Sequence, residues 1–351
     1  MADKWTDATW SPVVGCTKVS PGCDHCYAET MARRLRAMGR PEYQAAHDGA
    51  GWTGRAVCIP ERLEQPLKWR KLRHVFVVSM GDLFHIDVPN EYIAAVFGVM
   101  AATPQHTFQI LTKRPGSMLA WFRWFGGRAN GGGTGQLCIA HANDSMGRWG
   151  EKELDGSPAW PLPNVWLGTT CEDQQRADER IPLLLQCPAA VRFVSVEPML
   201  GEIDLGLQSA TCNCCPRWSS RWVRLKRHVK PEPILAATGI ARGCWAARGG
   251  IYRATSNRHG ALCIDTPGGR LGIKPDEFDC LTSLDWVICG GEFGHGARPM
   301  HLDWVRSLRD QCQAAEVRFF YKQGPGDYGS RHGKLPVLDG RILDDMPWRT
   351  S

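Results

Sequence analysis

The chain has 351 residues, of which 43% are hydrophobic, and it carries a formal net charge of +6. This composition is ordinary for a globular protein with one large core or a core plus a smaller module, and no stretch approaches the roughly 20 apolar residues of a membrane span. Because the N-terminus lacks an apolar signal core, we expect a cytoplasmic protein without a membrane partner. Its fifteen cysteines are then metal ligands or reduced core residues.

Three cysteines, Cys16, Cys23 and Cys26, lie close together near the N-terminus in a C-x6-C-x2-C pattern. Three thiolates suit a soft metal centre. A closed zinc site or a fully protein-ligated iron–sulfur cluster needs four ligands, so three cysteines would leave one iron of a [4Fe–4S] cluster open. The alternatives are a zinc site completed by His25 or a distant residue, and ordinary buried cysteines.

The rest of the chain alternates between short apolar runs and helical patterns. A first strand is predicted near residues 8–14, and further strands at 74–80, 107–113, 165–170, 191–196, 286–292 and 317–322. Helical spacing of apolar residues predicts a helix after the cysteines, with Tyr27, Met31, Leu35 and Met38 on its packed face. Further helices follow the strands, whereas residues 126–164 are predicted to form a long surface loop or lid.

Strands that are apolar throughout and alternate with helices predict an α/β fold with a parallel sheet. In such folds the chemistry gathers at the carboxyl ends of the strands. Polar residues and glycines follow the predicted strands and would ring one mouth of an open, partial (β/α) barrel. The candidate ligand-binding residues there are Gly81, Asp82, Lys113, Glu197, Gly290, Gly291 and Glu292. Asp82 could instead cap a helix. Lys113 and Arg114 could meet an anionic group of a ligand, or they could form ion pairs with Glu197 and Glu292 across the mouth.

A basic segment interrupts this pattern. Residues 212–274 hold twelve Lys or Arg against two acidic residues, a balance of +10, while the remainder, with 30 basic and 34 acidic residues, balances at −4. We predict that residues 206–280 form an inserted Cys/Arg/Trp-rich module, and that residues 1–205 and 281–351 form the barrel. Aromatic residues beside basic ones suit base stacking and phosphate contacts. The candidate nucleic-acid contacts are Arg217, Trp218, Arg221, Trp222, Arg224, Arg227 and Lys230.

The insert also has metal half-site spacing. Cys212-x2-Cys215 and His259-x3-Cys263 would together hold zinc, with a second iron–sulfur cluster as the other possibility. A disordered basic loop and a solvated positive face are the alternatives for this segment.

Seven short motifs carry a wider resemblance. In order, WSPVVGC at 10–16, the cysteine loop, SMGDLF at 79–84, LTKRP at 111–115, SVEP at 195–198, GGE at 290–292 and FYKQ at 320–323 resemble a phage-associated, functionally uncharacterised radical-SAM-like protein family. The resemblance covers most of residues 1–205 and 281–351. It implies a partial barrel of radical-SAM type. It also implies a [4Fe–4S] cluster on Cys16, Cys23 and Cys26, S-adenosylmethionine (SAM) bound at the mouth, an electron donor protein and a bacterial or phage-infected host cell.

These observations give two hypotheses. The first is a radical SAM enzyme that modifies or repairs a nucleic acid or nucleotide through hydrogen abstraction by a 5′-deoxyadenosyl radical, with Glu197 and Lys113 as catalytic residues. A loose resemblance of LTKR to spore photoproduct lyase-like repair enzymes and the basic insert favour this substrate class. The alternative is a non-catalytic, zinc-stabilised nucleic-acid-binding protein.

Overall fold

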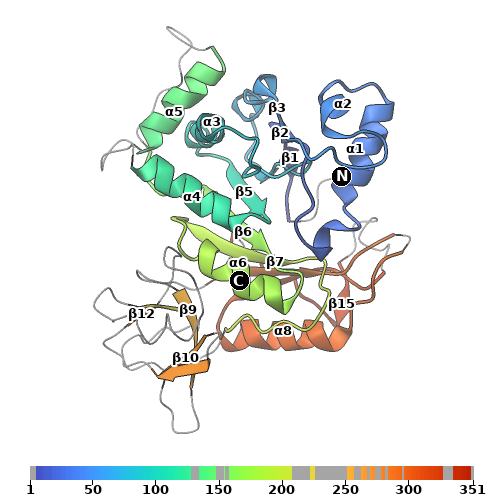
Figure 1. The fold of residues 1–351 in the computed structure, drawn as a ribbon, viewed down its shortest axis with the longest axis vertical. Helices are drawn as coiled ribbons and strands as arrows, with labels where there is room; N and C mark the ends of the chain where they lie inside the picture. The colour runs from blue at the N-terminus through green and yellow to red at the C-terminus, as the bar shows by residue number, and fades with distance from the viewer. Residues whose placement is uncertain are drawn as a thin grey trace.

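The computed structural model describes residues 5–127, 134–147, 154, 158–207, 222–225, 251–256, 262–266, 269–272, 278–280, 284–294, 296–326 and 335–348. Its centre is a curled, parallel, seven-stranded sheet that forms half of a barrel (Figure 1). The strands, in spatial order, are β1 (Ala8–Trp10), β4 (His74–Val77), β5 (Thr107–Thr112), β6 (Val165–Thr170), β7 (Val191–Val196), β13 (Trp286–Gly290) and β14 (Arg318–Gln323). The predicted α/β class and partial barrel are therefore confirmed.

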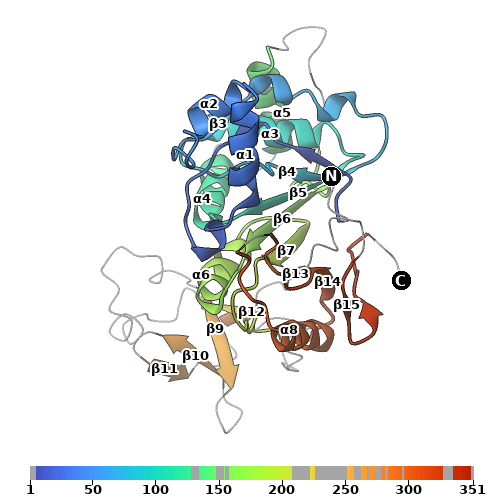
Figure 2. The same cartoon turned by 90° about the vertical axis from the view of Figure 1, so that its right-hand side faces the viewer.

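Helices cover the convex face of this sheet (Figure 2). They are α3 (Asn90–Ala101), α4 (Pro115–Gly126), α6 (Gln174–Leu184) and α8 (Leu302–Ala314). Residues from all four helices share one buried cluster with the outward-facing residues of the strands, for example Ile110, Leu167 and Val287. Because both faces of each strand are covered, the strands read as continuous apolar runs.

Both ends of the described chain fill the concave face. The Trp5 ring lies 5.1 Å from the ring of Phe76 and 5.9 Å from that of Trp286. Near the C-terminus, the Trp348 ring lies 5.3 Å from Trp166. These aromatic side chains form one buried cluster that closes the amino-terminal side of the half barrel. A ligand could therefore enter from the side of the carboxyl ends of the strands.

Smaller elements surround the cysteine segment. Strand β2 (Val13–Val14) comes just before this segment, and helices α1 (Tyr27–Ala37) and α2 (Glu42–Ala46) follow it. Strand β3 (Val57–Cys58) comes later in the chain and pairs with β2. The predicted helix after the cysteines is present, but of the four residues predicted to pack, Leu35 alone lies against a buried cluster. α1 buries Ala28 and Ala32, whereas Tyr27, Met31 and Met38 are exposed, because the small side chains let the helix lie close to its neighbours.

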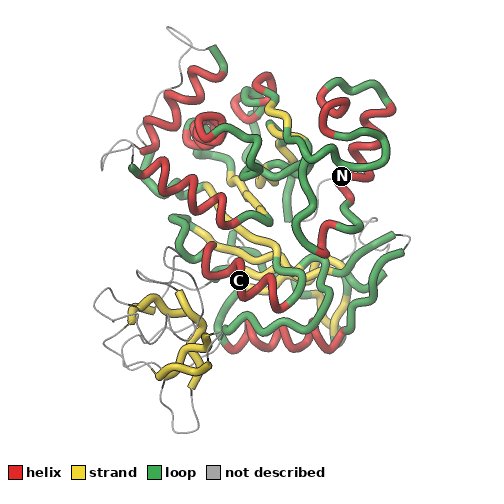
Figure 3. The backbone as a smooth tube through the Cα atoms, in the orientation of Figure 1, coloured by secondary structure: helices red, strands yellow, loops and turns green. Residues whose placement is uncertain are grey.

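The prediction of an unbroken loop over residues 126–164 was wrong for one segment. Helix α5 (Thr134–Ser145) lies within it and packs on α3 (Figure 3). A Cβ atom at Gly98 of α3 would lie 2.0 Å from the carbonyl oxygen of Cys138, so the two helices touch through their backbones. The contact uses the small residues Gly98, Cys138 and Ala142, which give little apolar periodicity in the sequence.

The basic insert contains a second sheet. Five antiparallel strands are arranged in the order β11 (Gly269–Gly272), β10 (Leu262–Thr266), β9 (Ile251–Ser256), β8 (Trp222–Leu225) and β12 (Phe278–Cys280). In the main sheet β7 and β13 pair directly, although the insert separates them in sequence. A hairpin of β15 (Val337–Leu338) and β16 (Arg341–Ile342) follows β14. In the described ranges, none of the helices has the length and apolar character that a membrane crossing requires.

The half barrel gives a test of its packing at Gly168 in β6. This residue lies opposite Phe193 of β7, and a Cβ atom there would lie 2.5 Å from the Phe193 ring. We expect Gly168→Ala to lower the free energy of unfolding by about 1–3 kcal/mol, because the added methyl group overpacks a full core. Urea unfolding followed by tryptophan fluorescence measures this.

The matched control is Gly201→Ala, where no atom lies within 4 Å of the added Cβ. This variant should stay within about 0.5 kcal/mol of the parent protein. Equal effects of the two substitutions would mean that Phe193 does not pack across Gly168 as described.

Candidate active site

A cavity of about 130 Å³ lies at the carboxyl edge of β4, β5 and β6. All three clustered cysteines line it, and they belong to a loop, residues 15–26, that we call the cysteine loop. Cys23 is buried, and Cys16 and Cys26 are half-buried. The other lining residues are Thr17, Lys18, Val19, Tyr27, Ala28, Trp52, Phe76, Val78, Ser79, Gly81, Asp82, Leu111, Thr112, Lys113, Arg114 and Thr170.

Two glycines start the cysteine loop at the sheet. Gly15 has φ +94°, a value that favours glycine, and its N–H donates to the Met80 carbonyl at 2.9 Å. Gly15 and Gly81 form an isolated parallel bridge. A Cβ atom at Gly81 would lie 2.8 Å from the Gly15 carbonyl oxygen. Gly81 therefore serves the close approach of two backbones, and this is enough to explain it without a ligand.

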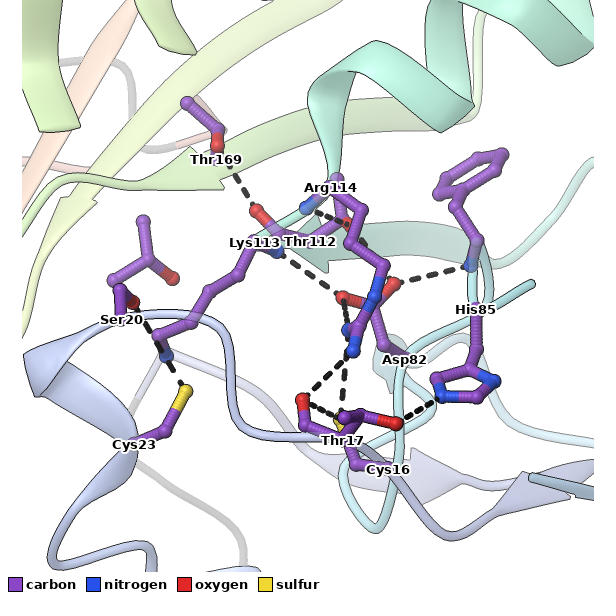
Figure 4. Close-up of polar contacts among 12 residues, drawn as sticks. Cys16, Thr17, Ser20, Cys23, Asp82, His85, Thr112, Lys113, Arg114 and Thr169 are labelled. Atoms are coloured by element: carbon purple, nitrogen blue, oxygen red, sulfur yellow. Dashed lines mark hydrogen bonds and ion pairs between the residues drawn. The ribbon is translucent and has the colours of Figure 1, made fainter. Parts of the chain in front are cut away.

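Asp82 holds the first of three ion pairs that fix the cysteine loop (Figure 4). Its carboxylate, nearly buried, accepts hydrogen bonds from the Phe84 and Lys113 N–H groups, from the Thr112 hydroxyl and from Arg114 Nη1 at 2.9 Å. Four donors satisfy a carboxylate. Asp82 therefore lies where the sequence predicted, but its oxygens are occupied by the protein.

Arg114 links Asp82 to Cys16, the first cysteine of the loop. Its Nη1 lies 3.4 Å from Cys16 Sγ, and its Nη2 donates to the Thr17 carbonyl at 2.7 Å. Burial raises the pKa of the Cys16 thiol, and Arg114 opposes that rise. The guanidinium is thus placed to offset negative charge on the Cys16 sulfur.

His85 also holds the cysteine loop in place, through Thr17. Its Nδ1 accepts the Asp87 N–H at 3.2 Å, so Nε2 carries the proton and donates to the Thr17 hydroxyl at 2.7 Å. The hydroxyl donates in turn to the Gly54 carbonyl at 3.2 Å. Burial, with Arg114 nearby, lowers the pKa of His85. The imidazole is held neutral and acts as a fixed donor.

Glu172, directly after β6, forms the second ion pair. Its side chain is fully buried, and Arg180 of α6 donates to Oε2 at 2.9 Å. The other oxygen accepts the Gly22 N–H of the cysteine loop at 3.3 Å. Burial favours the neutral acid, but Arg180, the Ser20 hydroxyl and Lys113 together hold the pKa of Glu172 below its usual value. A charged carboxylate therefore anchors the middle of the loop.

Glu292, after β13, forms the third ion pair with Arg298. The Arg298 Nε and backbone N–H both donate to Glu292 Oε2, at 3.0 and 2.9 Å, and Nη2 contacts Oε1. Arg298 Nη2 also donates to the Pro21 carbonyl at 2.8 Å, and His25 Nδ1 lies 3.0 Å from Glu292 Oε2. Burial favours the neutral acid, but Arg298 holds the pKa of Glu292 below its usual value.

Lys113 is placed differently from these acidic residues. Its side chain extends along the cavity toward the turn that carries Ser20 and Cys23 (Figure 4). No side-chain hydrogen bond or ion pair joins its ammonium group to another residue in the described part of the chain. Glu172 is an acidic neighbour in electrostatic reach. Lys113 is therefore the predicted site residue best placed to meet an anionic ligand.

The remaining predicted mouth residues lie at the other end of the half barrel. Glu197 Oε2 accepts a hydrogen bond from Lys322 Nζ at 2.9 Å, and both side chains are about one-fifth exposed. A Cβ atom at Gly290 would lie 3.3 Å from Glu197, and one at Gly291 would lie 3.0 Å from the Gly324 carbonyl oxygen. The structure thus groups Gly81, Asp82 and Lys113 around the cysteine cavity and Glu197, Gly290 and Gly291 beyond it.

The thiols of the cavity fit an iron–sulfur centre in kind. The three soft donors come from one loop, and the side chains of Arg114 and Lys113 line the same cavity and carry positive charge. Over the described ranges, no three His, Cys, Asp or Glu side chains form a group that could hold a metal ion as they stand. Cys16 Sγ instead contacts Arg114 and, at 3.5 Å, the Thr17 carbonyl.

The predicted residues of the insert are only partly described. Trp222 and Arg224 lie in β8, and Cys263 lies in β10, between β9 and β11. The other candidates lie outside the described residues: Cys212, Cys215, Arg217, Trp218, Arg221, Arg227, Lys230 and His259.

The sequence placed Arg114 at the mouth beside Lys113, but it did not reveal the other two arginines that make the site. Arg180 lies eight residues after its partner Glu172 and Arg298 six residues after Glu292, and neither belongs to a recognisable motif. Only one general signal was available. A carboxylate at a strand end that is also buried needs a cationic partner, but the sequence does not say which arginine supplies it.

Comparison with known proteins gives one match. A family model described as "Protein of unknown function (DUF5131)" matches residues 2–350 of the chain. No curated protein and no solved structure matches.

The buried pair of Glu172 and Arg180 predicts a pH-dependent stability. A lowered folded-state pKa means that the carboxylate stabilises the protein above the ordinary glutamate pKa, and that this contribution is lost as the pH falls through the lowered value. Glu172→Gln should destabilise the protein by about 3–5 kcal/mol at neutral pH, because it leaves Arg180 buried without its partner. It should also flatten the loss of stability between about pH 5 and pH 3.

Urea unfolding across this pH range measures both effects. The control is Glu179→Gln, which removes the exposed partner of Arg176 on the same helix and should change stability by less than about 1 kcal/mol. If the pH dependence of Glu172→Gln matches that of the parent protein, Glu172 is not charged in the folded state.

Proposed function

This chain belongs to the DUF5131 family, and from that premise we propose that it is an iron–sulfur enzyme of radical-SAM type. The observation that carries the proposal is the cavity at the carboxyl edge of a parallel half barrel, lined by three cysteines in a C-x6-C-x2-C pattern and by no other cysteine of the described chain. Cys16, Cys23 and Cys26 would hold a [4Fe–4S] cluster and leave one iron for SAM. Together, when bound, the cluster and SAM supply a radical that can abstract a hydrogen atom from a substrate.

In this proposal the three ion pairs keep the cysteines in register with the sheet. Arg114 holds the Thr17 carbonyl, Glu172 holds the Gly22 N–H, and Arg298 holds the Pro21 carbonyl. Preorganised groups of this kind lower the cost of aligning a reactive centre with its substrate. Asp82 and Glu292 act through these arginines as positioning residues, in place of the direct SAM contacts that the sequence suggested.

Lys113 then becomes the residue that binds the SAM carboxylate. It is the cavity cation without a side-chain hydrogen bond or ion pair to a described residue, and a carboxylate is the anionic group that SAM offers. The apolar side chains of Phe76, Val78 and Leu111 line the same cavity and would keep water from the reacting atoms.

Glu197 and Lys322 would face the substrate. Their ion pair lies at the ends of β7 and β14, beside Gly290, where a Cβ atom would lie 3.3 Å from Glu197. A carboxylate paired with an ammonium group can accept or return a proton. We assign Glu197 this role, with Lys322 holding its carboxylate in position.

The substrate class in this proposal is a nucleic acid or nucleotide. Its support is the balance of +10 over residues 212–274, against −4 for the remainder. Trp222 and Arg224 of that segment lie in β8 of the second sheet. A positive module attached to a half barrel would bring a polyanion to the enzyme through charge.

One feature supports a second candidate function. The half-sites Cys212-x2-Cys215 and His259-x3-Cys263 have zinc spacing, so a zinc-stabilised, non-catalytic nucleic-acid-binding protein is the alternative. Iron and zinc counts on anaerobically purified protein separate the two. A brown protein with iron supports the enzyme, and a colourless protein with zinc alone supports the binding protein.

The cluster assignment predicts the effect of removing each thiol. Single variants Cys16→Ala, Cys23→Ala and Cys26→Ala should each lose the bound iron and the visible absorbance of the reconstituted protein, because three thiolates are the minimum set. The control is Cys58→Ala, a half-buried cysteine that does not line the cavity. Iron content equal to that of the parent protein in all three variants would reject the assignment.

Lys113 gives a separate prediction about SAM. Replacing it with Met should weaken SAM binding to the reconstituted protein by about 10- to 100-fold, because a charge-assisted hydrogen bond is worth about 1.5–3 kcal/mol. Titration calorimetry with SAM measures this. Lys68→Met, at an exposed surface pair, should leave the affinity unchanged. A loss in Lys322→Met instead of Lys113→Met would move SAM to the other half of the mouth.

A further inference from the structure

An exposed apolar stripe starts at the cysteine cavity and runs along α1. It consists of Val19, Tyr27, Met31 and Met38, which are 43%, 51%, 41% and 74% exposed. Tyr27, Met31 and Met38 are spaced by four and seven residues, so they share one face of the helix. We call these four residues the α1 stripe. Scattered exposed hydrophobic residues are normal, whereas an aligned set on one helix face marks an interaction surface.

The stripe is not needed to hold α1 in place. The helix packs through Ala28, Ala32 and the half-buried Leu35, and the Tyr27 hydroxyl donates to the Ser79 carbonyl at 2.8 Å. In Figure 2 the α1 ribbon lies on the outside of the molecule, and the exposed fractions of the four side chains show that the described residues leave this face uncovered. The apolar face is therefore available to a partner.

Three arginines without a described ion-pair partner lie on α1 or just after it. Arg33, Arg34 and Arg40 are exposed and form no ion pair with another described residue. Arg34 lies on the same helix face as Met31 and Met38. A surface with an apolar centre and unpaired arginines at its edge complements an acidic partner.

The composition favours a protein over a nucleic acid as that partner. Tyr, Met and Arg are enriched in protein–protein interfaces, whereas Lys and Glu are depleted. Flexible methionine side chains adapt to an apolar protein surface. A phosphate backbone would use the arginines but would leave Met31 and Met38 in water.

The stripe is continuous with the proposed cluster site. Val19 and Tyr27 line the cavity together with Cys16, Cys23 and Cys26. A protein seated on the stripe would therefore cover the rim of that cavity, which is where a carrier must come to deliver an electron.

We propose that the α1 stripe, with Arg33, Arg34 and Arg40, is the docking surface for an acidic one-electron carrier protein. This rests on the proposed function, since the carrier serves the iron–sulfur centre. One electron leaves the reduced carrier, which becomes oxidised, and enters the centre, which becomes reduced; no bond forms or breaks.

Binding can be tested on the iron-free protein, so the test does not depend on the cluster. The probe is an oxidised plant-type ferredoxin, a small acidic carrier, titrated by biolayer interferometry at low salt. The charge-reversal variant Arg33→Glu/Arg34→Glu/Arg40→Glu and the polar variant Met31→Ser/Met38→Ser should each bind at least tenfold more weakly. The matched control is Arg70→Glu/Lys71→Glu/Leu72→Ser. These exposed basic and apolar residues lie just before β4, at the amino-terminal end of that strand, whereas the cysteine cavity lies at its carboxyl end. It should bind like the parent protein.

A second readout uses the reconstituted protein. Reduction by ferredoxin should slow at least tenfold in both α1 variants, while reduction by dithionite, which needs no docking surface, should keep its rate. Unchanged ferredoxin affinity in both variants overturns the proposal. So does a selective loss of binding to a short single-stranded DNA, which would assign the surface to nucleic acid. If the parent protein takes up no iron, the proposed function fails while the binding test still stands.

Discussion

The site depends on three ion pairs that hold an irregular loop against a regular sheet. The cysteine loop contains only one short 3-10 turn, Pro21–Cys23, so its own hydrogen bonds cannot fix it. Asp82, Glu172 and Glu292 follow three different strands, and each is paired with an arginine. Buried ion pairs add little net stability because desolvation offsets their attraction. We therefore interpret these pairs as devices that set the position of the loop.

This arrangement changes which residues are available for ligands. A carboxylate after a parallel strand is the usual place for a ligand contact in such folds. Here the oxygens of Asp82 are taken by four donors and those of Glu292 by Arg298 and His25. The cations are divided in the same way, because Arg114 is bound to the loop, whereas Lys113 points into the cavity. In our proposal, contacts to a ligand at this mouth are therefore made by residues outside the three ion pairs, such as Lys113.

The sequence predicted the sheet well because its strands are covered on both faces, which gives continuous apolar runs. The helices were harder where packing uses small residues. Ala28 and Ala32 bury α1, so the larger apolar residues that suggested a packed face belong to the surface. Gly98 and Cys138 bring α3 and α5 together without an apolar stripe. At the site, strand ends located Asp82, Lys113 and Glu292, and Arg114 falls in the LTKRP motif, but no local pattern identifies Arg180 and Arg298 as the partners of Glu172 and Glu292.

The register of the second sheet narrows the search for a nucleic-acid contact in the insert. Arg224 of β8 is paired in register with Asp279 of β12, and Asp265 of β10 with Arg270 of β11. Residues of opposite charge thus occupy paired positions in the backbone register of this sheet. Arg253 of β9 differs, because its register partner is Trp222 of β8. The register thus brings one tryptophan and one arginine of the insert to paired backbone positions, and these are the residue types that single-stranded nucleic acids use for base stacking and phosphate contacts.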